Sequence, residues 1–366
     1  MAEHPYKSAP GRNFWRRSVA DIEPGNVDPV SEFPIWINPE TRVATAGSCF
    51  AQHIARYLRT GGFNYYVTEP GHPILPGSVR TKNNYGLFSA RYGNIYTARQ
   101  LAQLVERAYG RFVPVESVWQ EADDVFLDPF RPSVQPGGYI SEVELALDRE
   151  QHFAAVREML ETLDVFVFTL GLTECWISSG DGAVFPLCPG VHGGRFDPAQ
   201  HVFYNQTLDD VVEDMTSFLM TLARLNPAAR VILTVSPVPL AATARHDQHV
   251  LTATTYSKAV LRVAAETLAM RFPHVAYFPS FEIITGAHNK GRYYAPDLRN
   301  VVETGVAHVM SLFMKHATTQ GLADVVPSGT DAPTRLQAEA SSDDAYLRFA
   351  QHIVEVECDE AALDRQ

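Results

Sequence analysis

Short apolar runs alternate with amphipathic segments along most of this chain. Four of the runs have the length and composition of strands, and they cover residues 42–46, 164–170, 230–239 and 275–278. Two of them, "DVFVFTL" and "RVILTVSPVP", are apolar at nearly every position. Continuous apolar runs are typical of strands that are buried on both faces, as in parallel sheets.

Segments with apolar residues at helical spacing separate these strands. In residues 50–62, apolar side chains fall on one face of a helix that ends in glycine. The other predicted helices cover residues 97–109, 149–163, 209–227, 254–272 and 303–317. Strands that alternate with crossover helices of this length predict an α/β fold, a three-layer α/β/α sandwich with a mainly parallel sheet.

The rest of the chain is polar or irregular. Residues 1–40 are rich in proline and predict an extended arm that packs on the domain, which spans residues 41–320. The domain contains irregular insertions near 111–148 and 177–205, and the second of these predicts a long loop over the site. Residues 321–366 predict a polar C-terminal extension.

Composition and charge exclude several classes of protein. The chain has 366 residues, 46% of them hydrophobic and 20% charged, and a formal net charge of −12. An acidic surface repels nucleic acid and anionic membranes. No segment approaches the ~20 apolar residues of a transmembrane helix, and the N-terminus lacks the apolar core of a secretory signal. We therefore expect a cytoplasmic protein with no nucleic-acid partner and no membrane span.

The cysteines argue against a disulfide framework and against a zinc site. Cys49, Cys175, Cys188 and Cys358 lie far apart, and no two of them form a CxxC pair. His192 does not complete a set with the spacing of metal ligands. We expect neither a metal nor a cofactor.

In open parallel sheets, ligands bind at the carboxyl ends of the strands, so the residues that follow each strand hold the candidate chemistry. These segments are "GSC" (47–49), "GLTE" (171–174), "SPVP" (236–239) and, before the last helix, "PDLRN" (296–300). In the first, Ser48 is suited to cap a helix and Cys49 to pack as a small buried side chain. Alternatively, the helix N-terminus lowers the pKa of the Cys49 thiol, and its N–H groups hold an oxyanion.

Several longer motifs resemble the GSCFA-domain family. They are "GSCFA" (47–51), "GLFSARYGNIYTARQL" (86–101), "TLGLTECW" (169–176), "SPVPL" (236–240), "TTYSKAVLR" (254–262) and "RYYAPDLRNVVETGV" (292–306). The likeness covers roughly residues 10–317. The plan of that family is similar to the SGNH (GDSL-type) hydrolases and acyltransferases, which implies a flavodoxin-like sandwich and the chemistry of esters.

The SGNH resemblance implies a nucleophile in the first motif. Its Gly-Asp-Ser block aligns with Gly47, Ser48 and Cys49, so that Cys49 takes the place of the nucleophile and its N–H joins the oxyanion hole. A shift of one residue would make Ser48 the nucleophile instead. The glycine of the second block corresponds to Gly93, with Asn94 beside it.

The third block, Gly-x-Asn-Asp, resembles residues 171–174. Thr173 takes the place of the asparagine that donates to the oxyanion, and its hydroxyl can donate as well. Glu174 takes the place of the aspartate, and an equally good interpretation is that it only orients the loop. Trp176, His192 and Arg195 follow in or beside the predicted loop, where they are suited to stack on a sugar or hold an anionic group.

The last block, Asp-x-x-His-Pro, is where this sequence departs from the SGNH plan. Asp297 matches its aspartate and is suited to orient a histidine or to pair with Arg299, which with Asn300 is a candidate for binding the substrate. Asn300 stands where the general base should be, and an amide cannot take a proton at neutral pH. A serine would be nearly inert without a base, whereas a cysteine with a lowered pKa depends less on one. His249 is the candidate base from another segment; His308 is better explained as a packed helix residue.

Two functions follow from this resemblance. The first is an ester-handling enzyme, a hydrolase or O-acyltransferase, that acts through an acyl intermediate on an acylated carbohydrate or related small ester, with acyl-CoA as an alternative donor. The second is a protein that binds an acyl or carbohydrate ligand without turnover, which Asn300 favours. A nucleotide-binding protein is disfavoured, because the first turn has neither G-x-G-x-x-G nor a P-loop pattern.

Overall fold

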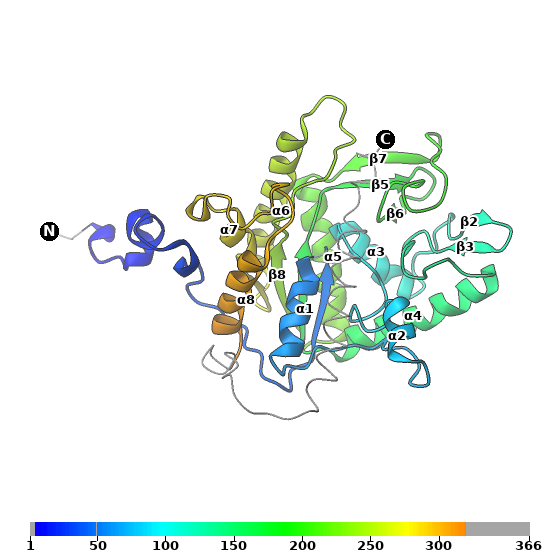
Figure 1. The fold of residues 1–366 in the computed structure, drawn as a ribbon, viewed down its shortest axis with the longest axis horizontal. Helices are drawn as coiled ribbons and strands as arrows, with labels where there is room; N and C mark the ends of the chain where they lie inside the picture. The colour runs from blue at the N-terminus through cyan, green and yellow to red at the C-terminus, as the bar shows by residue number, and fades with distance from the viewer. Residues whose placement is uncertain (1–3, 49, 320–366) are drawn as a thin grey trace.

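The computed structural model describes residues 4–48 and 50–319, and a parallel sheet forms the centre of the molecule (Figure 1). Its strands lie in the order β1-β4-β8-β9, with the bounds Val43–Gly47, Val165–Leu170, Arg230–Val235 and Val275–Tyr277. Each neighbouring pair is parallel, and Val165 pairs with Val43 on one side and with Arg230 on the other. The prediction of an α/β fold with a mainly parallel sheet is confirmed.

Tyr65 extends this sheet by a single parallel bridge to Val43. The Val43 amide donates to the Asn64 carbonyl at 3.0 Å, and the Tyr66 amide donates to the Val43 carbonyl at 2.8 Å. With this bridge counted as a position, the order is 2-1-3-4-5, as in flavodoxin-like sheets. In such sheets ligands bind where the order reverses, which here is the edge between the ends of β1 and β4.

Helices cover both faces of the sheet and give three layers (Figure 1). One layer consists of α1 (Phe50–Thr60), α7 (Ser280–Thr285) and α8 (Glu303–Ala317). The other consists of α3 (Ala98–Ala108), α4 (Glu142–Thr162), α5 (Leu208–Leu225) and α6 (Val250–Arg271). A further short helix, α2 (Gly77–Lys82), lies in the connection between α1 and α3.

Side chains alternate between the two faces of each strand, which explains how one sheet contributes to two hydrophobic cores. In β4, Phe166 and Phe168 pack with the layer of α3 to α6, whereas Val165 and Val167 pack with the layer of α1 and α8. Successive side chains of a strand point to opposite faces, and both faces are covered here. Continuous apolar runs are the consequence, and they are why the sequence predicts these strands well.

The two insertions contain strands that the sequence pattern did not predict. Within the first, β2 (Trp119–Ala122) and β3 (Val125–Leu127) form an antiparallel pair. Within the second, β5 (Glu174–Ser178), β6 (Val184–Phe185) and β7 (His201–Asn205) form an antiparallel sheet in the order β6-β5-β7. Residues 177–205 are therefore not a loop throughout, although the described residues 186–200 contain neither helix nor strand. Strands β5 and β7 are partly exposed and β6 has only two residues, so their apolar residues do not form a continuous run.

The described part of the N-terminal segment falls into two portions. Residues 4–22 lie to the side of the domain and are mostly exposed (Figure 1). Residues 27–37 lie against the domain, where Ile35 and Ile37 are buried and the Ile37 amide donates to the Ala317 carbonyl at 2.8 Å. The polar extension predicted for residues 321–366 lies outside the described residues.

Helix α5 begins at a capping box that offers a measurable test of local stability. The Thr207 hydroxyl accepts from the Asp210 amide, while the Asp210 carboxylate accepts from the Thr207 amide at 2.8 Å. We expect Thr207→Ala to lower the free energy of unfolding by about 1 kcal/mol. The Asp210 amide loses its acceptor, and the Asp210 carboxylate loses the hydroxyl that orients it toward the Thr207 amide. Urea denaturation measures this. Ser217→Ala, at an exposed interior position of the same helix, should leave the stability nearly unchanged, and an equal loss in both variants would contradict the capping role.

Candidate functional site

The turn after β1 lies where the strand order reverses. Gly47 has a φ of 136°, and its carbonyl accepts from the Ile95 amide at 2.9 Å. The Ser48 amide donates to the Thr169 carbonyl of β4 at 3.3 Å, and the Ser48 carbonyl accepts from Ala51 in the first turn of α1. This turn is therefore bound to β4 and to the segment around Ile95. Cys49 lies outside the described residues, between Ser48 and the start of α1.

The Ser48 side chain is buried and its hydroxyl has no hydrogen-bond partner among the described residues. Gly171 packs directly against it, since a Cβ added to Gly171 would lie 3.2 Å from the Ser48 Cβ and 2.9 Å from the Tyr96 carbonyl oxygen. An unsatisfied buried hydroxyl costs about 1–3 kcal/mol, so its presence here calls for an explanation, and a catalytic role is one of those that apply. The ends of β1 and β4 thus meet at Ser48 and Gly171.

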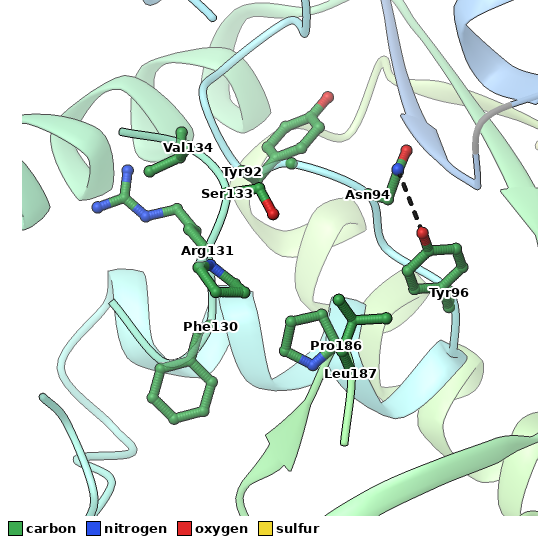
Figure 2. Close-up of a pocket in the computed structure, with 11 residues that line it drawn as sticks. Tyr92, Asn94, Tyr96, Phe130, Arg131, Ser133, Val134, Pro186 and Leu187 are labelled. Carbon is green, nitrogen blue, oxygen red and sulfur yellow. Dashed lines mark hydrogen bonds between the residues drawn. The ribbon is translucent and has the colours of Figure 1, made fainter. Parts of the chain in front are cut away.

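Gly93, the predicted oxyanion donor, and Asn94, predicted beside it for the substrate, lie in the segment that contacts the Gly47 carbonyl. Gly93 has a φ of 71°, and a Cβ there would meet no atom within 4 Å. Both residues line a small pocket of about 20 Å³, room for about one water, in which Asn94 donates to the Tyr96 hydroxyl at 3.3 Å (Figure 2). Pro186 and Leu187 form another wall of this pocket.

Thr173 follows β4 and is fully buried. Its hydroxyl donates to the Asn205 side-chain oxygen at 2.7 Å, and its amide donates to the Ser257 hydroxyl at 3.0 Å. The proton that the resemblance assigns to an oxyanion is thus directed at β7 in this structure. An oxyanion role for Thr173 would require its hydroxyl to rotate away from Asn205.

Glu174 and Trp176 lie on β5 and line a second, larger pocket. The Thr243 hydroxyl donates to the Glu174 carboxylate at 2.7 Å. Burial raises the pKa of the Glu174 carboxyl above its ordinary value, although hydrogen bonds from Thr243 and the Ala244 amide act to lower it. Of the other two loop residues predicted for the substrate, His192 is half-buried and Arg195 is exposed, and neither lines the two pockets described here.

Asp297, Arg299 and Asn300 form a self-contained turn on the surface. The Asp297 carboxylate accepts from the amides of Arg299 and Asn300 at 3.0 Å each and also from the Asn300 side chain. The pKa of Asp297 is lowered because these hydrogen bonds outweigh the raising effect of burial. The turn lies near the carboxyl end of β8, since the neighbouring Tyr294 hydroxyl donates to the Pro237 carbonyl at 2.8 Å.

The candidate histidines are placed differently from one another. His249 is exposed at the N-cap of α6, where its Nδ1 accepts from the Leu251 amide at 3.1 Å. His308 is buried in α8 with its Nδ1 2.8 Å from the Tyr293 hydroxyl, and burial lowers its pKa. His249 thus caps a helix with one ring nitrogen. His308 is a buried residue of α8 that packs against Tyr293, as expected.

Lys258 is a residue of this site that the sequence reasoning missed. It lies on α6 and is buried, and its ammonium donates to the Gly171 carbonyl at 2.7 Å. Lys258 and Ser257 therefore hold the two ends of the turn at 171–173, which packs on Ser48. A signal was present, because the lysine falls on the buried stripe of α6 at helical spacing, between Ala253 and Leu261, where lysine is rare.

A family model matches this chain over most of its length. The model is that of the GSCFA family, and it matches residues 42–313. The chain belongs to the GSCFA family. The matched region begins immediately before β1 and ends within α8, so it contains the turn at Ser48, the turn at 171–173 and Lys258. No curated protein matches this GSCFA protein.

Three further observations concern the part of this GSCFA protein that the structure describes. In the described parts, 4–48 and 50–319, histidine, cysteine, aspartate and glutamate side chains do not gather in groups of three or more that could hold a metal ion. Over the same residues, none of the helices is long and apolar enough to cross a membrane. Cys175 and Cys188 are free thiols, and burial raises the pKa of the Cys188 thiol to about 11.

Proposed function

We propose that this GSCFA protein is an ester-handling enzyme of the SGNH type, in which Cys49 carries the acyl group and Lys258 supports the proton transfers. The observation that carries the proposal is the buried Lys258 ammonium on the Gly171 carbonyl. Gly171 packs on Ser48, the residue before Cys49, at the point where the strand order reverses. A cation beside a cysteine at a helix start favours the thiolate.

Lys258 can supply the proton transfers for which the SGNH plan uses a histidine, the residue that Asn300 replaces here. An SGNH site with asparagine in the place of histidine lacks its usual base, and the exposed turn of Asp297 and Asn300 supplies no proton acceptor beyond the Asp297 carboxylate that closes it. A thiolate nucleophile needs no base for its attack. What it needs is a positive charge that stabilises the thiolate and a proton for the leaving alkoxide.

The reaction proceeds in two steps. The Cys49 thiolate attacks the ester carbonyl carbon, the carbon–oxygen bond to the alcohol breaks, and the departing alkoxide takes a proton from Lys258. Water or a sugar hydroxyl then attacks the thioester carbon and gives its proton back to Lys258. The carbon–sulfur bond breaks, which releases the acid or the new ester and regenerates the Cys49 thiolate. The N–H groups at Cys49 and Gly93 are suited to hold the oxyanion. An O-acyl carbohydrate or related small ester is the proposed substrate class, with acyl-CoA as an alternative donor.

Intact-mass measurement with p-nitrophenyl acetate tests the covalent step. We expect the protein to gain the mass of one acetyl group and Cys49→Ala to remain unmodified, because the thiolate is the acceptor. Ser48→Ala should still be acetylated. Cys188→Ala is the control for non-specific thiol reaction, and it should react like the unmodified sequence, since a thiol with a pKa of about 11 is mostly protonated at neutral pH.

The same experiment identifies the alternatives. Acetylation that survives in Cys49→Ala and disappears in Ser48→Ala would assign the nucleophile to Ser48. No adduct and no turnover with the unmodified sequence would favour the second function, a binder of acyl or carbohydrate ligands. Asn300 is the observation that favours that second function, because it stands where the SGNH plan has its base.

A further inference from the structure

A second pocket lies between the carboxyl ends of β4 and β8 and the small antiparallel sheet. It has a volume of about 240 Å³. Its walls are mostly apolar and come from β5 and β7, from the segment that follows β6 and from the segment 242–244 after β8. This volume is about eight times the ~30 Å³ that a water occupies in the liquid, so it suits a ligand of small size.

The pocket has one charged side chain in its described lining, and that side chain is acidic. Glu174 provides a carboxylate, whereas the described lining contains no lysine, arginine or histidine. The nearest polar group, the Thr243 hydroxyl, donates its proton to Glu174 at 2.7 Å. The pocket therefore offers hydrogen-bond acceptors and negative charge, which disfavours a carboxylate or phosphate ligand.

The apolar walls are aromatic on one side. Trp176 of β5 and Phe203 of β7 are cross-strand partners, with ring centroids 5.7 Å apart in an edge-to-face arrangement. Leu172 and Leu187 add aliphatic surface. Aromatic faces attract a cation as well as an apolar group, and the effect grows when the cation is removed from water.

We propose that this pocket binds a small primary ammonium compound with an aromatic or aliphatic body. The ammonium donates to the Glu174 carboxylate, and the body packs between Trp176, Phe203 and Leu187. Burial raises the pKa of the Glu174 carboxyl, and the hydrogen bonds from Thr243 and the Ala244 amide and the charge of Arg245 offset only part of that effect, so an ammonium within reach would stabilise the ionised form further. A sugar would be recognised by several strongly polar groups, whereas the described lining provides the Glu174 carboxylate, the Thr243 hydroxyl, the Trp176 indole N–H and the weakly polar thiols of Cys175 and Cys188.

Three small probes of matched size test the proposal: 2-phenylethylammonium, the neutral 2-phenylethanol and the anionic 3-phenylpropionate. Isothermal titration calorimetry, with saturation-transfer NMR for weak binding, measures their affinities. We expect the ammonium to bind at least ~10-fold more tightly than either of the others. Glu174→Gln should erase that preference, because it removes the charge with little change in shape. Glu213→Gln is the control, an exposed carboxylate outside the pocket, and it should keep the preference.

The pH dependence gives a second, independent readout. Only the ionised carboxylate attracts the ammonium, so affinity for 2-phenylethylammonium should rise as pH rises through the elevated pKa of Glu174 and then level off. The probe amine stays protonated across that range, since its pKa is near ~10. The affinity for 2-phenylethanol should not change with pH.

Two further variants keep the test decisive. Ala242→Phe fills the pocket without a change of charge and should abolish binding of the ammonium, even if Glu174→Gln proves unstable in thermal denaturation. Cys49→Ala should bind the probe normally, because this inference rests on the pocket and not on the acyl chemistry. Equal binding of alcohol and ammonium, tighter binding of 3-phenylpropionate, or no binding of any probe would each overturn the proposal.

Discussion

Lys258→Met is expected to slow acyl transfer from an unactivated alkyl ester, ethyl acetate, at least ~100-fold, because the departing alkoxide takes its proton from Lys258 and this is the lower end of the range for a lost general acid or base. Methionine has nearly the length of lysine and suits a buried position, so the fold should survive. What is lost is the positive charge beside the turn at 171–173 and Ser48. The ratio kcat/KM for the ester, measured over pH 5–9, is the readout.

Alkylation of Cys49 distinguishes a chemical role of Lys258 from a role in packing alone. With Lys258 present, the thiol should react with iodoacetamide at neutral pH, because the proposed mechanism has the Lys258 cation favour the thiolate. In Lys258→Met the pH midpoint of this reaction should move upward, as mass spectrometry of the peptide that contains Cys49 would show.

An exposed lysine provides the control for this experiment. Lys82→Met removes a charge at an exposed position of α2 and should change neither the rate nor the alkylation. If Lys258→Met folds normally, keeps its activity and alkylates at the same pH, Lys258 only holds the Gly171 carbonyl, and the proposed mechanism is wrong.

The fold could be predicted from the sequence wherever one physical signal dominated. Strands β4 and β8 are buried on both faces, so their sequences are apolar without interruption and their positions were evident. Helix α5 combines an apolar stripe with a cap at Thr207, and its start differs from the expected one by a single residue. Helix α4 was predicted from residue 149 but begins at Glu142. Its first turns carry the exposed apolar residues Val143 and Leu147, so apolar residues there are not confined to one face and the helical pattern is hard to recognise.

The candidate site could be predicted only in part, because its contacts join distant segments. The carboxyl ends of β1 and β4 were correctly expected to adjoin, and Ser48 and Gly171 meet there. No feature of the sequence indicates that the Thr173 hydroxyl is directed at Asn205, a residue of a strand that the pattern did not predict. Lys258 reaches Gly171 from a helix 87 positions further along the chain, and only the packing of α6 makes that contact.

Gly47→Ala is expected to be among the most destabilising single substitutions in this chain. Gly47 has a φ of 136°, a region that residues with a side chain rarely adopt, at a cost of about 1–3 kcal/mol. An added Cβ would also lie 2.7 Å from the Thr169 Cβ and 2.8 Å from the Thr169 nitrogen, and closer still to the Thr169 carbonyl oxygen. These are atoms of the buried strand β4, so separating them adds about 1–3 kcal/mol more, and we expect a total loss of roughly 2–6 kcal/mol.

Gly62→Ala isolates the two contributions. Gly62 also has a positive φ, 76°, but a Cβ there would meet no atom within 4 Å, so only the backbone term of about 1–2 kcal/mol applies. Urea denaturation of both variants should therefore show the larger loss for Gly47→Ala, by at least ~1 kcal/mol. Equal losses would mean that β4 moves aside at no cost. In that case the close approach of β1 to β4, on which the placement of Ser48 beside Gly171 depends, is not a rigid feature of the site.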